Sequence, residues 1–157
     1  MEAAIVSLLK KGFSSGIKLK VAGDFEEEFV VVWSHKMSES ALATWKDENN
    51  YTSIGAVALA ILLVEQLLHF VLFEESLIGT GIDFWMNRKD GGQDEITYSE
   101  RQARLEVSGI SKEAPGNTVN MRIQQKKKQI AASDNTELPG WIVIVEFATP
   151  KSKIIKK

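Results

Sequence analysis

The sequence predicts a single α/β domain with a mixed central sheet flanked by helices, and three observations support this class. Residues 17–21 alternate between apolar and polar side chains, and residues 141–147 form a β-branched run, both of which are typical of strands. Two longer segments, at about 52–73 and 118–132, begin at residues that cap helices. The length of 157 residues, with 44% hydrophobic and 25% charged residues, suits one domain.

Composition excludes several classes of chemistry. The chain has no Cys, which excludes disulfides, thiolate metal sites and cysteine nucleophiles. Only His35 and His69 supply imidazole, so neither zinc catalysis nor Ser–His chemistry is expected. The net charge of −2 is not that of a typical nucleic-acid-binding protein. Residues 151–157 carry four lysines and no acid, so we expect the domain to cover residues 1–150 and a basic C-terminal tail to follow it.

The first half of the chain predicts a helix and a hairpin. Residues 2–11 form an amphipathic pattern that ends in lysines, as helices often do. The strand at 17–21 and a second β-branched run at 28–33 are separated by a turn signal at 22–24. We therefore expect an antiparallel hairpin, followed by a polar helix or loop over residues 36–51.

A long apolar helix is expected next. Thr52 or Ser53 can cap it, and it runs to about Phe73 with apolar residues on all sides, so it belongs in the interior. Its run of nine apolar residues at 56–64 is followed by Glu65 and other polar side chains that are costly inside a bilayer. We expect a buried core helix rather than a membrane span and, because the N-terminus lacks a signal-peptide pattern, a cytoplasmic protein.

The second half predicts strands around another helix. After the break at Gly79-Thr80-Gly81 we expect a strand at 82–86, a polar loop at 87–95 and one strand or two within 96–110. Pro115 and Gly116 end this region. The helix at 118–132 follows, and Pro139-Gly140 precedes the last predicted strand.

Three acids lie in apolar surroundings. Glu65 interrupts the long helix, and Asp83 and Glu106 lie within strand-like runs. An acid at such a position is costly unless it is paired or binds a cation. If Asp83 and Glu106 converge, Mg²⁺ or Mn²⁺ would remove their repulsion, since hard cations prefer carboxylate oxygens. In the alternative interpretation, Glu106 pairs with Arg104 or Arg101, and Asp83 accepts backbone N–H groups.

These residues resemble the PD-(D/E)XK superfamily of restriction-endonuclease-like nucleases over about residues 52–148. The resemblance rests on Asp83 in one strand, Glu106-Val107-Ser108 in the next, and flanking helices. It implies a core of helix, strands, helix and strand, and phosphodiester hydrolysis with Mg²⁺ held by Asp83 and Glu106. An additional helix acid, present in some members, falls on Glu65.

The sequence departs from this family in two ways. The family's lysine, two residues after the acid, is replaced by Ser108. Lys128 in the following helix is the best substitute, with Gln124 one turn earlier on the same face, and either Lys128 or Ser108 would orient water. The predicted elements also include one strand fewer before Glu106 than the family normally has, unless 96–110 divides.

The helix at 118–132 has two interpretations. It is amphipathic, so its cations can simply face water. If the protein binds nucleic acid, DNA or RNA phosphates would contact substrate-binding residues on this helix and the preceding strand, namely Arg104, Arg122, Gln124, Lys126 and Lys127.

The sequence therefore predicts a divalent-metal-dependent nuclease or nuclease-like subunit. The alternative is a non-catalytic interaction module of the same fold that acts in a complex or homodimer. A large exposed apolar patch on the N-terminal hairpin or on the strand at 141–147 would favour the alternative.

Overall fold

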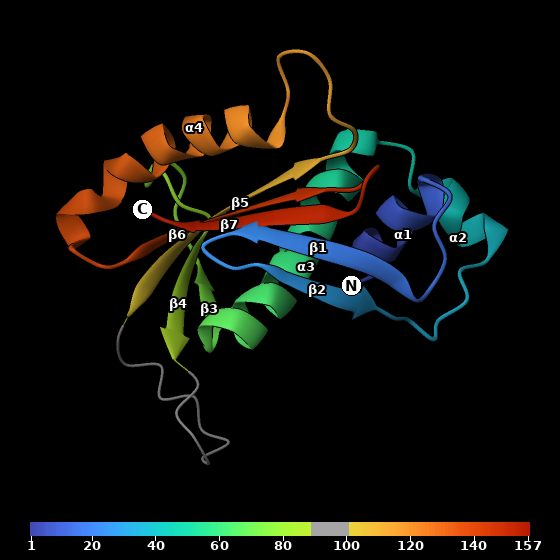
Figure 1. Cartoon of the computed structure of the whole chain (residues 1–157), viewed down its shortest axis with the longest axis horizontal. Helices are drawn as coiled ribbons and strands as arrows, with labels where there is room; N and C mark the ends of the chain where they lie inside the picture. Colours follow the sequence, from blue (N-terminus) through green and yellow to red (C-terminus); the bar gives the residue numbers. More distant parts are fainter. Residues whose placement is uncertain (89–100) are drawn as a thin grey trace.

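The computed structural model describes residues 1–88 and 101–157, excluding the side chains of Leu72 and Phe73. Its seven strands form one sheet in the order β2-β1-β7-β6-β5-β4-β3 (Figure 1). Two neighbouring pairs, β1 with β7 and β5 with β6, are parallel, and the other pairs are antiparallel. The strands are β1 (Ile17–Gly23), β2 (Glu27–Val31), β3 (Phe70–Glu75), β4 (Phe84–Arg88), β5 (Ala103–Ile110), β6 (Gly140–Glu146) and β7 (Lys151–Lys156).

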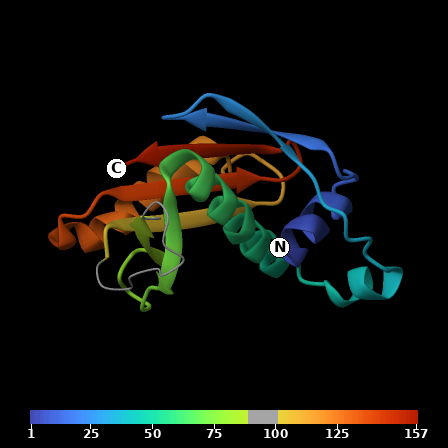
Figure 2. The same cartoon turned by 90° about the horizontal axis from the view of Figure 1, so that it is seen from below.

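Helices cover both faces of the sheet (Figures 1 and 2). The chain forms α1 (Glu2–Lys10), α2 (Glu39–Thr44), α3 (Glu48–Leu68), α4 (Val119–Ile130) and a short 3₁₀ helix, η1 (Ala131–Thr136). Helices α1 and α3 pack together, and α3 also packs against β5 and β6, whereas α4 packs against the same two strands from the other face. The predicted mixed α/β domain is confirmed.

Alternation along the central strands separates two apolar cores. Leu105 and Val107 of β5 point toward α3, as do Val143 and Val145 of β6. The intervening residues of β6, Ile142 and Ile144, join the smaller core beneath α4. Because successive side chains of a strand point to opposite faces, β5 presents Arg104, Glu106 and Ser108 to α4.

The long helix begins and ends earlier than the sequence predicted. Asp47 caps α3, and its Oδ1 accepts hydrogen bonds from the N–H groups of Asn49 and Asn50, at 2.9 and 3.2 Å. The helix ends at Leu68 and is followed by the C-cap His69, which has a left-handed φ of 56°. Residues 70–75, part of which was expected to be helical, form β3 and pair antiparallel with β4. An apolar run alone does not distinguish a helix turn from a buried strand.

Helix α3 is long and apolar enough to cross a membrane. An 18-residue window of this helix has a mean hydropathy of 1.8, and half of the window is buried inside the protein.

Helix α3 lies close to β5 because of a glycine in that strand. A Cβ atom at Gly109 would lie 2.5 Å from the backbone oxygen of Thr52. Glycine at this position therefore allows the N-terminal half of α3 to approach the sheet closely.

The predicted basic tail is wrong: residues 151–156 form β7, which lies between β1 and β6. Its fully buried Ile154 joins the core beneath α3, while Ile155 joins the core beneath α4. Lys151 and Lys153 are only partly exposed. The four lysines at 151–157 predict an exposed tail, yet the two isoleucines of β7 are buried on opposite faces of the sheet.

The remaining elements largely follow the predictions. The N-terminal hairpin is confirmed, because β1 and β2 pair antiparallel. Residues 89–100, which include most of the predicted loop at 87–95 and the start of the predicted 96–110 region, lie outside the described residues. Strands β3, β4 and β5 form an antiparallel meander, and α4 connects β5 to the parallel strand β6.

Candidate functional site

The pairing of β4 with β5 brings Asp83 next to Glu106. Phe84 lies opposite Leu105, so Asp83, directly before β4, is opposite Glu106. The N–H of Asp83 donates to the carbonyl of Leu105 at 2.9 Å, and the N–H of Val107 donates to Oδ2 of Asp83 at 2.7 Å. The Asp83 carboxylate is thereby held against the backbone of β5.

Glu106 is fully buried and has an unusual environment. Its Oε1 accepts a hydrogen bond from Nζ of Lys126, whereas its Oε2 has no hydrogen-bond donor among the described residues. Burial raises the pKa of Glu106 to about 7. The hydrogen bond from Lys126 opposes this shift, and the nearby negative charge of Asp83 adds to it. A protonated Glu106 would donate to Asp83, which also favours the neutral form.

Helix α4 supplies the cations at the site. Nη1 of Arg122 donates to Oγ of Ser108 at 3.3 Å, and its Nη2 donates to Oδ1 of Asn117 at 2.6 Å. Lys126, one turn later, contacts Glu106 and also Oε1 of Gln129 at 3.1 Å. Glu106 and Ser108 are two residues apart in β5, and Lys126 and Arg122 are one turn apart in α4. Because these two spacings are similar, each polar residue of β5 contacts one cation of α4.

A cavity of about 590 Å³ adjoins these residues. Asp83, Ser108, Arg122 and Lys126 line it from the sheet and α4, and the N-terminal half of α3 contributes Ser53. Carboxylate, hydroxyl and cationic groups thus face one space that is bounded by three separate elements. Such a space, with polar groups converging on it, is typical of a ligand site.

The loop between β3 and β4 forms a rim of this cavity and was not identified as functional from the sequence. It presents Leu77 and Ile78 almost fully to solvent, with exposed fractions of 81% and 105%. Oγ of Ser76 lies 2.6 Å from Oγ1 of Thr80, which donates to the carbonyl of Leu77 at 2.8 Å. The loop also lies against α4, since a Cβ at Gly81 would be 2.1 Å from the carbonyl oxygen of Gln129. Two adjacent aliphatic residues in a segment rich in turn residues were the available signal.

Several residues proposed from the sequence lie elsewhere. Glu65 does not line the cavity; it is eight residues beyond Val57, which does, and so about 12 Å further along α3. Gln124, Lys127 and Lys128 are exposed on α4 and do not line the cavity either. The structure therefore brings Lys126, not Lys128, to Glu106.

Arg104 was expected at the substrate, and the structure corrects this. It is 4% exposed and its Nε donates to the carbonyl of Leu138 at 2.9 Å. Its Nη1 donates to Oγ of Ser133 at 3.0 Å and to Oδ1 of Asp134 at 3.2 Å. Arg104 thus holds η1 and the approach to β6 in place, because these hydrogen-bond partners of its side chain lie in residues 130–138.

The donor set at the site is small. Among residues 1–88 and 101–157, no group of three or more His, Asp or Glu side chains gathers as a metal cluster. Asp83 and Glu106 provide two carboxylates, which fits Mg²⁺, because this ion commonly binds through one or two carboxylates and keeps water or substrate phosphate as its other ligands. Oε2 of Glu106 is buried and accepts no hydrogen bond from the residues that the structure describes, so it can accept one from a ligand.

Comparisons with protein-family models, curated proteins and solved structures give no match to this chain.

Proposed function

We propose that this protein is a divalent-metal-dependent nuclease and a divergent relative of the PD-(D/E)XK enzymes. The observation that carries the proposal is the convergence of Asp83, Glu106 and Lys126 beside a polar cavity. Two carboxylates and a lysine are the groups that the family resemblance implies. They come from three different elements, so the fold brings them together.

The order of elements also supports this proposal. The series α3, β3, β4, β5, α4 and β6 is a helix, three strands, a helix and a strand. The resemblance implies a core of this kind, and β3 is the strand that the sequence interpretation lacked. Asp83 lies directly before β4 and Glu106 lies within β5, and these are the second and third strands of this series.

Each residue has a distinct role in the proposed mechanism. Asp83 and Glu106 would hold Mg²⁺ or Mn²⁺, which when bound polarises a phosphoryl oxygen and lowers the pKa of water. Arg122, on the cavity wall, would bind a substrate phosphate. Ser108 contacts Arg122 and would hold its guanidinium in position.

Lys126 takes the place that the resemblance assigns to a lysine in β5. That position is Ser108 in this chain, and Lys126 reaches Glu106 from α4 instead. Lys126 also lines the cavity, so its ammonium would hold the attacking water or the phosphate. The substitute that we propose is therefore Lys126, one helical turn from Arg122.

A non-catalytic interaction module is the second candidate, and a specific contact favours it. Glu106 already accepts a hydrogen bond from Lys126, and Asp83 accepts a backbone hydrogen bond from Val107. Both acids therefore have partners without any metal ion. In this case the residues would stabilise the fold, and the chain would act through its surfaces.

Cleavage assays distinguish the two candidates. We expect single- or double-stranded DNA or RNA to be cleaved with Mg²⁺ or Mn²⁺, and Asp83→Asn, Glu106→Gln and Lys126→Met each to reduce the rate roughly 100-fold or more. Glu39→Gln, at an exposed position on α2, is the matched control and should leave the rate unchanged. Circular dichroism checks that each variant is folded.

Metal binding gives a second measurement. Calorimetric titration with Mn²⁺ should show binding by the wild type that is lost in Asp83→Asn and Glu106→Gln. Wild-type protein that neither cleaves nucleic acid nor binds Mn²⁺ would remove the nuclease proposal and leave the interaction module.

A further inference from the structure

The edge of the sheet farthest from β3 is open. Strand β2 is the outermost strand at this side and pairs only with β1 among the described residues. Gly16 N–H donates to the carbonyl of Val31 at 3.0 Å, and Trp33 N–H donates to Oγ of Ser15 at 2.8 Å. Backbone groups alternate in direction along a strand, so those of Val30 and Val32 point away from β1.

The part of this edge from Phe29 onward lacks the usual protection against pairing, whereas Glu27 and Glu28 before it are charged and exposed. Proteins protect edge strands with charged side chains, especially lysines, and with prolines, bulges or covering elements. Residues 29–33 read Phe-Val-Val-Val-Trp, with no charge and no proline. Val30 and Val32 are 60% and 71% exposed. The segment can therefore accept another strand through its backbone and bury apolar side chains as it does so.

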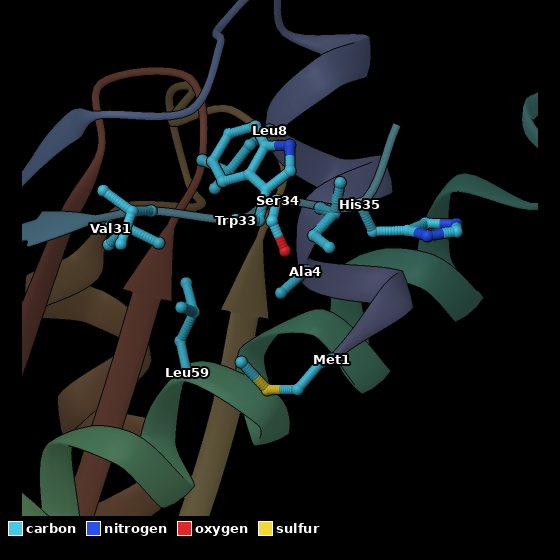
Figure 3. Close-up of a pocket in the computed structure, with 10 residues that line it drawn as sticks. Met1, Ala4, Leu8, Val31, Trp33, Ser34, His35 and Leu59 are labelled. Atoms are coloured by element: carbon cyan, nitrogen blue, oxygen red, sulfur yellow. The ribbon is translucent and has the colours of Figure 1, made fainter. Parts of the chain in front are cut away.

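Two apolar grooves lie beside β2 on the face covered by α1 and α3. One, of about 520 Å³, is bounded by Met1, Leu8, Val31, Trp33 and Leu59 (Figure 3). The other, of about 250 Å³, is bounded by residues of β2 and by exposed apolar side chains of α3 such as Leu62. A strand added to β2 would lie over both grooves.

The charge pattern of the edge identifies its occupant. Three exposed acids, Glu26–Glu28, precede the apolar segment, and His35 and Lys36 follow it, also exposed. If two copies pair antiparallel about Val31, Val30 lies opposite Val32 of the partner subunit. The same register places Glu26 opposite Lys36 of the partner subunit, and Phe29 opposite Trp33 of the partner subunit. It also makes Val30 and Val32 a hydrogen-bonded pair, as their outward backbone groups require.

We propose that this chain forms a two-fold symmetric homodimer in which residues 26–36, that is β2 and the residues on either side of it, pair antiparallel with the same residues of a second copy. Two seven-stranded sheets then become one continuous sheet, and the grooves beside β2 are covered. The interface is self-complementary, as a two-fold axis demands. This inference does not depend on the nuclease proposal, because β2 and the cavity beside Asp83 share no residue.

Sedimentation equilibrium of the full chain over a wide range of protein concentration tests the dimer. The wild type should dimerise reversibly, and the double variant Val30→Lys/Val32→Lys should remain monomeric, with its Kd raised more than about 100-fold, because lysines on an edge strand oppose pairing. Met121→Lys, which places the same charge at an exposed apolar position on α4, is the matched control and should dimerise normally. Circular dichroism and thermal unfolding verify that each variant is folded.

Charge reversal tests the register. Glu26→Lys or Lys36→Glu alone should raise the dimer Kd about tenfold, because each replaces two symmetry-related attractions by repulsions. The double variant Glu26→Lys/Lys36→Glu should restore the wild-type Kd. A wild type that stays monomeric throughout, a dimer unaffected by the lysines on β2, or a double variant without recovery would each overturn the proposal.

Discussion

The carboxyl group of Glu106 is buried and lies next to both a cation, Lys126, and another acid, Asp83. Its pKa of about 7, against an ordinary value of 4.5, arises mainly from burial. The neutral form is therefore favoured in the folded protein up to neutral pH, whereas the unfolded chain loses the proton near pH 4.5. At pH values between these two, the native state binds more protons than the unfolded state, so stability falls as pH rises.

We expect this acid to contribute to stability below pH 4.5 and to lose that contribution as pH rises to about 7. A shift of this size corresponds to roughly 3 kcal/mol of unfolding free energy. Denaturant unfolding of the wild type and of Glu106→Gln over this range measures it, because glutamine does not titrate. The difference in unfolding free energy between the two proteins should change with pH in this direction, and a difference that is constant would show that the environment of Glu106 is not as described.

Arg104 illustrates a buried cation whose role is structural. Its guanidinium joins β5 to η1 through the carbonyl of Leu138 and the side chains of Ser133 and Asp134. We expect Arg104→Ala to lower the free energy of unfolding by about 3–5 kcal/mol, the usual effect of breaking a buried charged network. Arg104→Lys should also destabilise, because one ammonium cannot match the planar fork. Exposed Lys127→Ala is the control in the same denaturation assay and should change little.

At the scale of elements, β3 and β7 change the interpretation of the chain. The local sequence predicts another structure for each of them. The apolar pattern of α3 continues into β3 and predicts more helix there, and the lysines of β7 predict an exposed tail. Each is specified by its neighbours, since β3 pairs with β4, and β7 pairs with both β1 and β6. The pairing of β7 joins the N-terminal hairpin to β6, so the sheet is continuous only when residues 151–156 are present.

Strand β7 should consequently be required for folding. We expect Ile154→Ala to lower the free energy of unfolding by about 2–5 kcal/mol, because its side chain is fully buried. Truncation after Pro150 should abolish the cooperative unfolding transition. Lys156→Ala, in the same strand but exposed, is the matched control and should change stability by less than about 0.5 kcal/mol. If the truncated chain unfolds cooperatively with wild-type stability, β7 is not required for folding and the prediction is wrong.

At the scale of the whole molecule, the net charge is small but positive charge is concentrated locally on α4. The net charge is −2, yet α4 carries Arg122, Lys126, Lys127 and Lys128 and no acid. Lys126 contacts Glu106, while Lys127 and Lys128 are exposed on the helix next to the cavity. If the protein binds nucleic acid as the nuclease proposal requires, this local surface would attract the phosphate backbone, and the attraction would be sensitive to salt.

Salt dependence of nucleic-acid binding tests this expectation. For Asp83→Asn, used to prevent cleavage, three phosphate contacts from α4 predict a slope of about −3 when log K is plotted against log salt concentration. Lys127→Ala/Lys128→Ala should reduce the magnitude of the slope by about 2. Lys10→Ala/Lys46→Ala, which removes two exposed lysines outside α4, is the control. Fluorescence anisotropy with a labelled oligonucleotide measures the binding, and equal slopes for both double variants would exclude α4 as the contact surface.

The sequence by itself determined the α/β class and the N-terminal hairpin, and it identified Asp83 and Glu106 as acids in unusually apolar surroundings. These features depend on local periodicity and on the cost of placing a charge among apolar residues, both of which can be seen in a single chain. The sequence also proposes Lys126 as a phosphate-binding residue, whereas it favours Lys128 as the substitute for the family's lysine.

Tertiary structure alone decided the rest. Which lysine of α4 reaches Glu106 depends on the rotation of the helix over the sheet, and all three consecutive lysines satisfy the same local pattern. Whether residues 70–75 and 151–156 become strands depends on partners far away in the sequence. Long-range pairing and helix rotation are set by the packing of the whole core, which no short window of residues contains.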